Sequence, residues 1–236
     1  MTQSILEICE EALNGVGVDP PSSLTTGDLG RRLLGIANAV GQSVATRYDW
    51  QELKTEGTFT TTASQELQMT WDDDFPNARK FLDDTFWNRT TQRRLFRMTD
   101  QAWQRIKAYG PSPATEVYYW QGRKLLMDSD TVVGSQTIAF EYIDKRWAVE
   151  ADGTTYARRF VNNTDMPRLD DHIFVLGVRW RYLQSLGLEY GEHFREYEDY
   201  VYQKQAEDQP LEKLSMNPYN SGEEFVRQVP DGSWNL

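Results

Sequence analysis

Closely spaced acidic residues are the first candidates for chemistry in this sequence. Three groups stand out, at Asp72–Asp74, Asp83–Asp84 and Asp170–Asp171. Two carboxyl groups at a suitable separation can hydrolyse a glycosidic bond. A chain with 36 acidic residues nevertheless forms such groups by chance, and adjacent side chains on a strand point to opposite faces. We therefore interpret the first two groups as solvated loops and the third as a helix N-terminus, where anions are favoured.

Histidine and cysteine offer little further chemistry. The two histidines, His172 and His193, lie at helical positions among aromatic and charged residues, and the single cysteine, Cys9, lies on the apolar stripe of a predicted helix. One cysteine excludes an internal disulfide framework and a multi-cysteine metal site. The sequence also lacks a Gly-Lys-Ser/Thr phosphate loop, a Gly-x-Ser-x-Gly motif and a His-Glu-x-x-His motif. We predict no catalytic residue, no metal site and no cofactor.

Cations are concentrated between Arg79 and Lys124, with Trp87, Phe96 and Trp103 interleaved. Such a region can contact phosphates and stack on bases, or it can pair with the acidic surface of a partner or a neighbouring subunit. Because the net charge of the chain is −11, we favour the second interpretation. The residues predicted to form this interface are Arg89, Arg93, Arg94 and Arg97.

The composition is that of a folded protein. The 236 residues include 8 Trp, 12 Tyr and 10 Phe, which is too aromatic for a disordered chain. The net charge disfavours tight non-specific binding to nucleic acid and to an anionic membrane surface. The longest apolar run, Ile173–Val178, is far shorter than the roughly 20 residues of a membrane-spanning helix, and the acidic N-terminus is unlike a secretory signal. We expect a soluble protein that folds in a reducing cytoplasm.

Helices are predicted near the N-terminus and again toward the end of the chain, before residue 208. Ser4 and Glu7 form a capping box that begins the first helix, and Gly187 ends a later one. Between these ends, apolar residues recur at helical spacing and mark the buried sides. Four helices are predicted in this way, at 4–14, 28–48, 170–186 and about 189–207.

The middle of the chain alternates polar and apolar residues and is rich in Thr and aromatic residues, as half-buried strands are. The predicted strands lie at 58–62, 67–71, 117–120, 123–127 and 136–143, with a short helix after Thr99–Asp100. This order predicts an α+β fold: an α-helical bundle of N- and C-terminal helices, with an inserted β-rich domain and an extended C-terminal tail. The predicted divisions are 1–54 and 166–208 for the bundle, 55–165 for the β-rich domain and 209–236 for the tail.

The predicted tail is polar and rich in Pro and Gly, yet apolar residues recur along it. A plain linker would be Gly/Ser-rich and would lack such anchors. We therefore expect the tail to become ordered on a partner, with Trp234 as the first anchor. The anchors are Leu211, Leu214, Tyr219, Phe225, Val229 and Trp234.

Several stretches of this sequence resemble a family of tailed-phage neck proteins, and the resemblance extends from the first helix to about residue 207. The N-terminal pattern Ala12–Gly17, followed by Pro20–Pro21, is also similar to the tail tubular protein A group of short-tailed phages. The other stretches are Phe75–Pro76, Phe86–Leu95, Gln101–Gln104, Gln121–Gly122, Leu125–Leu126, Ala139–Ile143, Lys145–Trp147, Asn163–Pro167, Leu176–Arg181 and Gly187–Tyr190.

The resemblance implies a head-to-tail adaptor, also called a connector or head-completion protein, which is a structural protein of the virion and not an enzyme. Such proteins form a ring, usually of twelve copies, beneath the portal of the filled capsid. The ring continues the channel for DNA ejection and provides the docking surface for the tail or nozzle protein. The implied location is the neck of the virion, after synthesis in the host cytoplasm, with no membrane as partner.

If the chain is such an adaptor, we predict that the C-terminal anchors dock on the portal and that the four arginines form a subunit or tail interface. We expect acidic side chains, such as those of the helix containing Glu192–Asp199, to line the lumen, because a negative wall repels phosphates and lets packaged DNA pass without specific binding. Two other functions stay open. One is a virion-associated peptidoglycan hydrolase, and the other is a nucleic-acid-binding module that uses the Arg79–Lys124 region.

Overall fold

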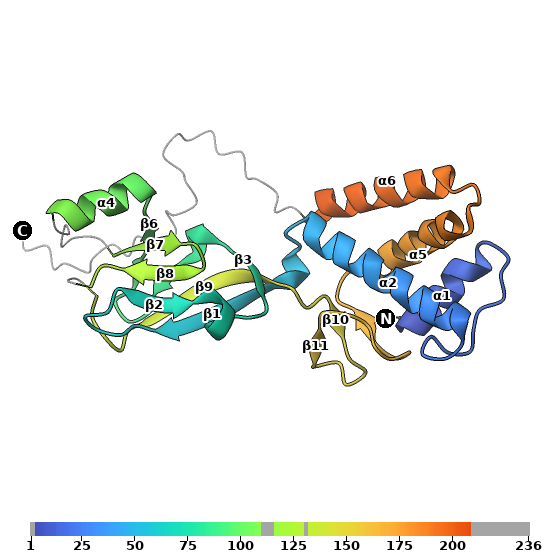
Figure 1. Cartoon of the computed structure of the whole chain (residues 1–236), viewed down its shortest axis with the longest axis horizontal. Helices are drawn as coiled ribbons and strands as arrows, with labels where there is room; N and C mark the ends of the chain where they lie inside the picture. Colours follow the sequence, from blue (N-terminus) through green and yellow to red (C-terminus); the bar gives the residue numbers. More distant parts are fainter. Residues whose placement is uncertain (1–2, 110–115, 130–131, 209–236) are drawn as a thin grey trace, which may run out of the picture.

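The computed structural model describes residues 3–109, 116–129 and 132–208. The chain is an α+β protein, as predicted, and its main helices and its larger sheets occupy different ends of an elongated molecule (Figure 1). We call residues 3–53 and 145–208 the helical lobe, and the described part of 54–144 the β lobe. The helices of the helical lobe are α1 (Ile5–Asn14), α2 (Asp28–Arg47), α5 (Asp171–Leu186) and α6 (Gly191–Asp208).

The ends of these helices are set by local signals. The Ser4 hydroxyl accepts a hydrogen bond from the Glu7 amide, and the Glu7 carboxylate accepts one from the Ser4 amide at 2.8 Å, so the predicted capping box is confirmed. At the start of α5, the Asp170 carboxylate accepts a hydrogen bond from the His172 amide at 3.0 Å. The same helix ends at Gly187, whose φ of 70° is a left-handed conformation that favours glycine.

The four helices share one hydrophobic core with α5 at its centre, since α1, α2 and α6 all pack against α5. A Cβ atom on Gly41 would lie 2.2 Å from the Trp147 ring, so this glycine lets the indole pack directly on the backbone of α2. Phe160 packs on the same indole at a centroid distance of 4.8 Å. Both aromatic residues come from the segment 55–165 that the sequence predicts to be β-rich, yet their side chains complete the core of the helices.

The strands form three sheets. A five-stranded sheet has the order β1-β9-β4-β5, with β3 also paired to β9, and a four-stranded sheet has the order β2-β8-β7-β6. The third sheet, β11-β10-β12, belongs to the helical lobe. The strands are β1 (Lys54–Thr60), β2 (Leu67–Thr70), β3 (Ala78–Phe81), β4 (Trp87–Asn88), β5 (Arg93–Arg94), β6 (Phe96–Arg97), β7 (Val117–Gln121), β8 (Lys124–Met127), β9 (Thr137–Asp144), β10 (Ala148–Val149), β11 (Tyr156–Ala157) and β12 (Met166–Pro167).

The β lobe has its own hydrophobic core, separate from that of the helices. The Phe86 ring stacks on Phe140 from the first sheet at 4.9 Å and on Tyr118 from the second at 4.4 Å. Strand β1 begins at Lys54, whereas the sequence predicts a start at residue 58. The prediction misses the first residues because the buried position among them is Gly57, which has no apolar side chain to mark the alternation. A Cβ atom there would lie 2.7 Å from the ring of Phe75. Two short helices, α3 (Trp71–Asp74) and α4 (Asp100–Tyr109), complete this lobe.

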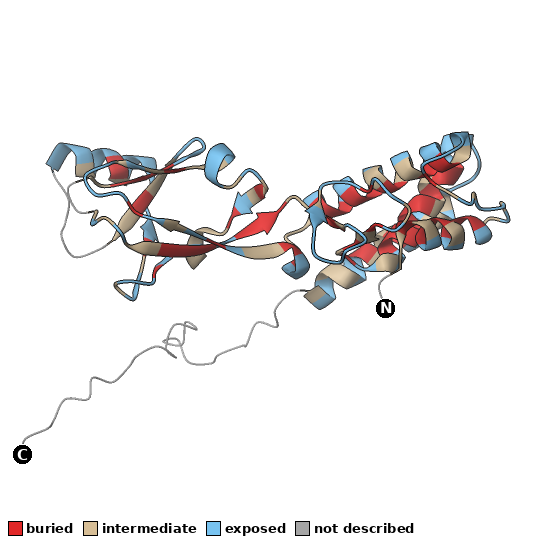
Figure 2. Ribbon diagram, turned by 90° about the horizontal axis from the view of Figure 1, so that it is seen from below, coloured by how far each residue is buried: buried red, intermediate tan, exposed pale blue. Residues whose placement is uncertain are grey.

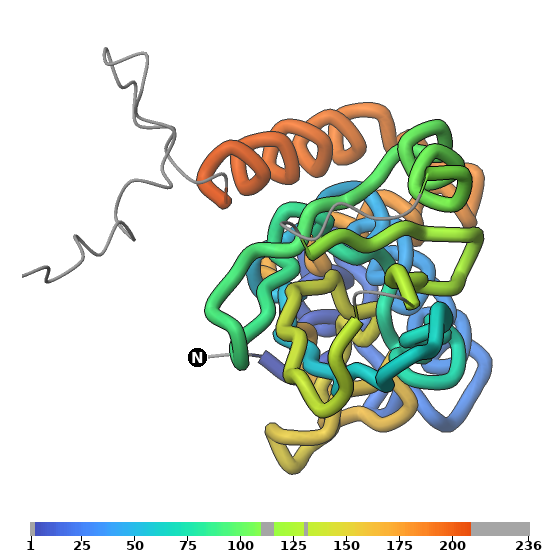
Figure 3. The backbone as a smooth tube through the Cα atoms, turned by 90° about the vertical axis from the view of Figure 1, so that its left-hand side faces the viewer, coloured from blue at the N-terminus to red at the C-terminus, as the bar shows by residue number. Residues whose placement is uncertain are grey.

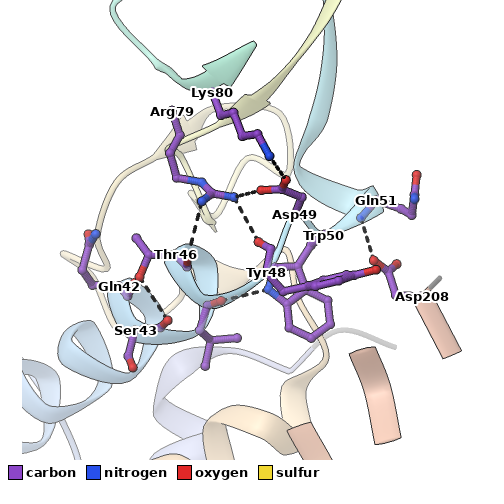
Figure 4. Close-up of polar contacts among 11 residues, drawn as sticks. Gln42, Ser43, Thr46, Tyr48, Asp49, Trp50, Gln51, Arg79, Lys80 and Asp208 are labelled. Carbon is purple, nitrogen blue, oxygen red and sulfur yellow. Dashed lines mark hydrogen bonds and ion pairs between the residues drawn. The ribbon is translucent and has the colours of Figure 1, made fainter. Parts of the chain in front are cut away.

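The two lobes meet in a group of polar contacts at the end of α2 (Figure 4). The Asp49 carboxylate accepts hydrogen bonds from the guanidinium of Arg79 at 2.5 Å and from the ammonium of Lys80 at 2.6 Å, both on strand β3. The Arg79 guanidinium also donates hydrogen bonds to two backbone carbonyl groups at the C-terminal end of α2, that of Tyr48 at 3.0 Å and that of Thr46 at 3.4 Å. We call these contacts the Asp49 latch, because they connect a helix of one lobe to a strand of the other.

Buried residues are found inside both lobes, and exposed residues cover their outer surfaces (Figure 2). The view along the long axis shows α6 on one side of the molecule and the β10–β11 segment on the opposite side (Figure 3). Within the described ranges, no helix combines the length and the apolar character that crossing a membrane requires.

Candidate protein–protein interface

The predicted interface arginines lie where the chain passes from one sheet of the β lobe to the other. Strands β4 and β5 form a hairpin at the edge of the first sheet, and β6 is the edge of the second. Between them, the side chain of Leu95 is buried in the core of the lobe. The segment Arg93–Arg97 therefore forms an exposed edge of both sheets while a core residue holds its centre in place.

A buried amide fixes this hairpin. Asn88 is fully buried, and its side-chain carbonyl accepts hydrogen bonds from the amides of Thr90 and Thr91 at 3.0 and 3.1 Å. Its amide group donates to Glu116 and to Gln136, both at 2.8 Å. All four hydrogen bonds of the Asn88 side chain are satisfied, which is needed for a buried polar group. The sequence gives no local signal for this network, because Glu116 and Gln136 are distant along the chain.

Two aromatic side chains are exposed beside the arginines. Trp87 lies opposite Arg94 in the β4–β5 pair, and the Arg94 guanidinium lies over the Phe96 ring at 5.4 Å from its centroid. Trp87 is 39% exposed and Phe96 is 48% exposed. We call Trp87, Arg93, Arg94 and Phe96 the arginine–aromatic surface. Aromatic residues and arginine are enriched at protein interfaces, so this composition is typical of a contact surface.

The structure divides the four predicted arginines. Arg89 pairs with Glu56 at 2.6 Å, Arg94 pairs with Asp84 at 3.1 Å, and Arg97 pairs with Asp83. Among the residues that the structure describes, Arg93 has no ion pair, and its side chain is exposed. Three of the predicted cations are therefore already neutralised by acids of their own chain, and Arg93 is the one whose charge is directed to solvent.

Arg97 has a structural role that the sequence does not reveal. Its partner Asp83 also accepts a hydrogen bond from the Trp120 indole at 3.2 Å, and the Asp83 carbonyl accepts one from the Tyr118 hydroxyl at 2.7 Å. Asp83 thereby connects β6 to the strand β7 beside it. Burial and the neighbouring Asp83 carboxylate both raise the pKa of Tyr118, so the phenol stays neutral.

The other cations of the Arg79–Lys124 region are also largely paired within the chain. Lys107 pairs with Glu66 at 2.5 Å and Arg123 pairs with Asp72 at 2.9 Å, in addition to the contacts of the Asp49 latch. A free basic patch of the kind that binds phosphates non-specifically would leave these cations without acidic partners. Most of the cations of this region therefore contact acidic groups of their own chain among the described residues.

The closely spaced acids have structural roles. Asp74 accepts a hydrogen bond from the Thr70 amide at 2.7 Å, and Asp170 caps α5 as predicted. Burial raises the pKa of the neighbouring Asp171, whose carboxylate accepts a hydrogen bond from the Gln3 amide at 2.9 Å. His172 stacks edge-on against Tyr200 at 4.8 Å. Within the described ranges, no group of His, Cys, Asp or Glu residues is arranged to hold a metal ion.

Cys9 is fully buried on the inner face of α1, as the apolar stripe predicted. Burial raises the pKa of its thiol to about 12, and the charge of Glu10 contributes in the same direction. A buried neutral thiol is a poor nucleophile, so this residue serves the core.

The predicted portal-docking anchors, from Leu211 to Trp234, lie outside the described residues and stay a prediction. Comparison with models of known protein families finds no match for this chain, and comparison with curated proteins finds none either.

Proposed function

We propose that this chain is a head-to-tail adaptor of a tailed phage: a structural, non-enzymatic virion protein that assembles as a ring beneath the portal. In this proposal, the four helices of the helical lobe form the bundle, the β lobe is an inserted domain, and 209–236 is an extended tail that docks on the portal. The proposal rests on the resemblance of the sequence to the neck proteins and on the arrangement of surfaces in the structure.

The observation that carries the proposal is the placement of the arginine–aromatic surface on a lobe with its own core. An adaptor must bind one partner above and another below, and separate lobes allow two interfaces to form independently. Exposed Trp87 and Phe96 beside Arg93 give the β lobe the composition of a docking site for a tail or nozzle protein. The helical lobe, with its C-terminal extension, is then the portal-proximal part.

The charge of the chain supports the role of the ring as a channel. A net charge of −11 per copy leaves an excess of acidic side chains, and in this proposal some of them line the inner wall of the ring, where they repel the phosphates of DNA. Packaged DNA therefore passes through the lumen without specific binding.

Binding to heads tests the proposal. The purified chain is mixed with DNA-filled, portal-bearing heads that lack tails, and bound protein is separated by sedimentation through a density gradient. We expect the chain to co-sediment with these heads and to enable the attachment of purified tails. Absence of binding contradicts the proposal, and so does lysis of peptidoglycan in a zymogram that single Asp or Glu substitutions abolish, since that result assigns the hydrolase function instead.

A further inference from the structure

A second group of cations lies at the junction of the lobes, away from the arginine–aromatic surface. The Lys145 ammonium donates a hydrogen bond to the Pro76 carbonyl at 3.2 Å, and the Arg158 guanidinium donates to the same carbonyl at 2.8 Å. Arg158 also donates to the side-chain carbonyl of Asn77 at 3.0 Å. Two cations that share one acceptor atom lie close together, and with the nearby Arg123 we call them the Pro76 cation cluster.

The positive charge of this cluster is balanced only in part by its own chain. Asp72 pairs with Arg123, whereas neither Lys145 nor Arg158 forms an ion pair with any residue that the structure describes. Burial lowers the pKa of Lys145, and the positive charges of Arg158 and Arg123 lower it further, while the carboxylates of Asp72 and Asp144 offset only part of this shift. Because like charges repel at this separation, an acidic group from outside the chain would relieve an existing cost.

Helix α6 carries the complementary feature. Glu192, Glu196 and Asp199 lie four and three residues apart, so they share one face of the helix, and all three are exposed. Within the described part of the chain, Glu192 and Asp199 have no ion pair, and Glu196 has one, with the His193 imidazole at 3.7 Å. We call these three residues the α6 acidic stripe.

Helix α6 and the segment that joins Lys145 to Arg158 lie on different sides of the molecule. Figures 1 and 3 place α6 on one side of the molecule and the β10–β11 segment, which lies between Lys145 and Arg158 in the sequence, on the opposite side. A contact between two different surfaces on opposite sides is heterologous, and repetition of such a contact gives either a closed ring or an open filament.

We propose that the Pro76 cation cluster of one copy receives the α6 acidic stripe of a second copy of this chain. This inference rests on the proposed ring and names the surfaces that join its subunits. It moves the cationic side of the subunit contact from Arg89, Arg94 and Arg97, which are paired internally, to Lys145 and Arg158. It also assigns the stripe on α6 to the subunit contact, so that other acidic side chains line the lumen.

Charge reversal on either surface tests the contact. The cluster variant carries Lys145→Glu and Arg158→Glu, and the stripe variant carries Glu192→Lys, Glu196→Lys and Asp199→Lys. Self-association of the full chain is measured by sedimentation velocity over a range of protein and NaCl concentrations. We expect the wild type to associate, and to do so less as NaCl rises from about 0.05 to about 0.5 M, because salt screens exposed charges. Each variant alone should associate at least about tenfold more weakly, since its two surfaces then carry the same sign.

Mixing the two variants gives the sharpest result. In an alternating assembly, every contact between a cluster variant and a stripe variant joins opposite charges, so an equimolar mixture should associate as the wild type does. Restoration in the mixture also shows that both variants are folded. The matched control carries Arg31→Glu and Arg105→Glu, two exposed positions away from both surfaces with the same change in net charge as the cluster variant, and it should associate like the wild type.

Three outcomes overturn the inference: a wild type that stays monomeric at every concentration, variants that associate like the wild type, or a mixture that does not associate. Electron microscopy of the variants on portal-bearing heads separates this failure from failure of the proposed function. If both variants form rings of normal appearance on the heads, the proposed contact is wrong and the adaptor function is unaffected. If the wild type never binds heads, the adaptor function itself is wrong.

Discussion

Arg93 and Arg97 have similar positions in the sequence but different environments in the fold. Arg93 is exposed and has no ion pair in the described part of the chain. Arg97 forms an ion pair with Asp83, and the Asp83 carbonyl accepts a hydrogen bond from the Tyr118 hydroxyl on strand β7. We predict that Arg93→Glu changes the free energy of unfolding by less than about 0.5 kcal/mol, as surface substitutions do. The same change should weaken tail attachment about tenfold or more, because a central interface arginine commonly contributes over 1 kcal/mol.

Arg97→Glu is the matched comparison. It removes the ion pair and places a second negative charge next to Asp83, so we expect a loss of stability of about 1–2 kcal/mol, reduced by the partial exposure of both side chains. Urea denaturation measures stability and gradient sedimentation with tails measures attachment. Equal attachment by Arg93→Glu and wild type would remove the arginine–aromatic surface from the proposed tail interface.

Cys9 gives a prediction about accessibility and pH. Because the thiol is fully buried with a pKa of about 12, we predict no reaction with a thiol-specific reagent at pH 8 in the native state, and complete reaction in denaturant. The unfolded thiol ionises near its usual pKa, so the native state keeps its proton over the interval from about 9 to about 12. The contribution of Cys9 to stability is thus present below that interval and is lost as the pH rises through it. Cys9→Ala should show a smaller loss of stability between pH 8 and 10 than the wild type, whereas rapid native labelling would contradict the burial.

At the scale of elements, the Asp49 latch joins the two lobes, together with the hydrogen bonds that Lys145 and Arg158 donate to the Pro76 carbonyl. Burial alone would raise the pKa of Asp49, but Lys80 and Arg79 outweigh it and hold the pKa below its usual range. A lowered pKa means that the ion pairs stabilise the junction above the unfolded pKa, near 4, and are lost as the pH falls through the folded value. The latch is therefore intact at neutral pH.

Asp49→Asn should loosen the orientation of the lobes while leaving both cores folded. Spin labels at Gln104→Cys in α4 and Ser43→Cys in α2, two exposed positions, report the distance between the lobes by pulsed electron spin resonance. We expect a broader distance distribution in Asp49→Asn than in the wild type. Asp28→Asn, which removes an exposed ion pair within one helix, should leave the distribution unchanged. An equally narrow distribution in Asp49→Asn would show that the latch does not set the orientation.

The elements that the sequence predicts well are those with local signals. The capping box at Ser4, the aspartates before α5 and the glycine after it lie within a few residues of the ends that they define. The strands β3 to β6 and β10 to β12 are too short to show a clear alternation of polar and apolar residues in the sequence. Strands β3 and β4 also pair with the distant strand β9, and β6 pairs with the distant strand β7. The same applies to the candidate site. Arginines at 89–97 are visible in the sequence, but their partners Glu56, Asp83 and Asp84 are chosen by the fold.

At the scale of the whole molecule, the proposed adaptor must connect to the portal through a segment beyond α6. Truncation after residue 208 keeps all the described helices and strands, so we predict a folded chain with unchanged thermal stability. Binding to portal-bearing heads should fall at least about tenfold, and Trp234→Ala in the full chain should cause part of that loss, because buried tryptophans dominate such contacts. Thermal unfolding and gradient sedimentation with heads provide the two readouts. Unchanged binding by the truncated chain would place the portal contact in the helical lobe.

Cryo-electron microscopy of the wild-type chain bound to DNA-filled, portal-bearing heads tests the central claim most directly. The account predicts a closed ring beneath the portal, with the helical lobe next to the portal, the β lobe directed outward and an open lumen aligned with the portal channel. A ring in the opposite orientation would contradict the assignment of the lobes. Heads that carry no added density at the portal, or density scattered over the capsid, would contradict the adaptor function as a whole.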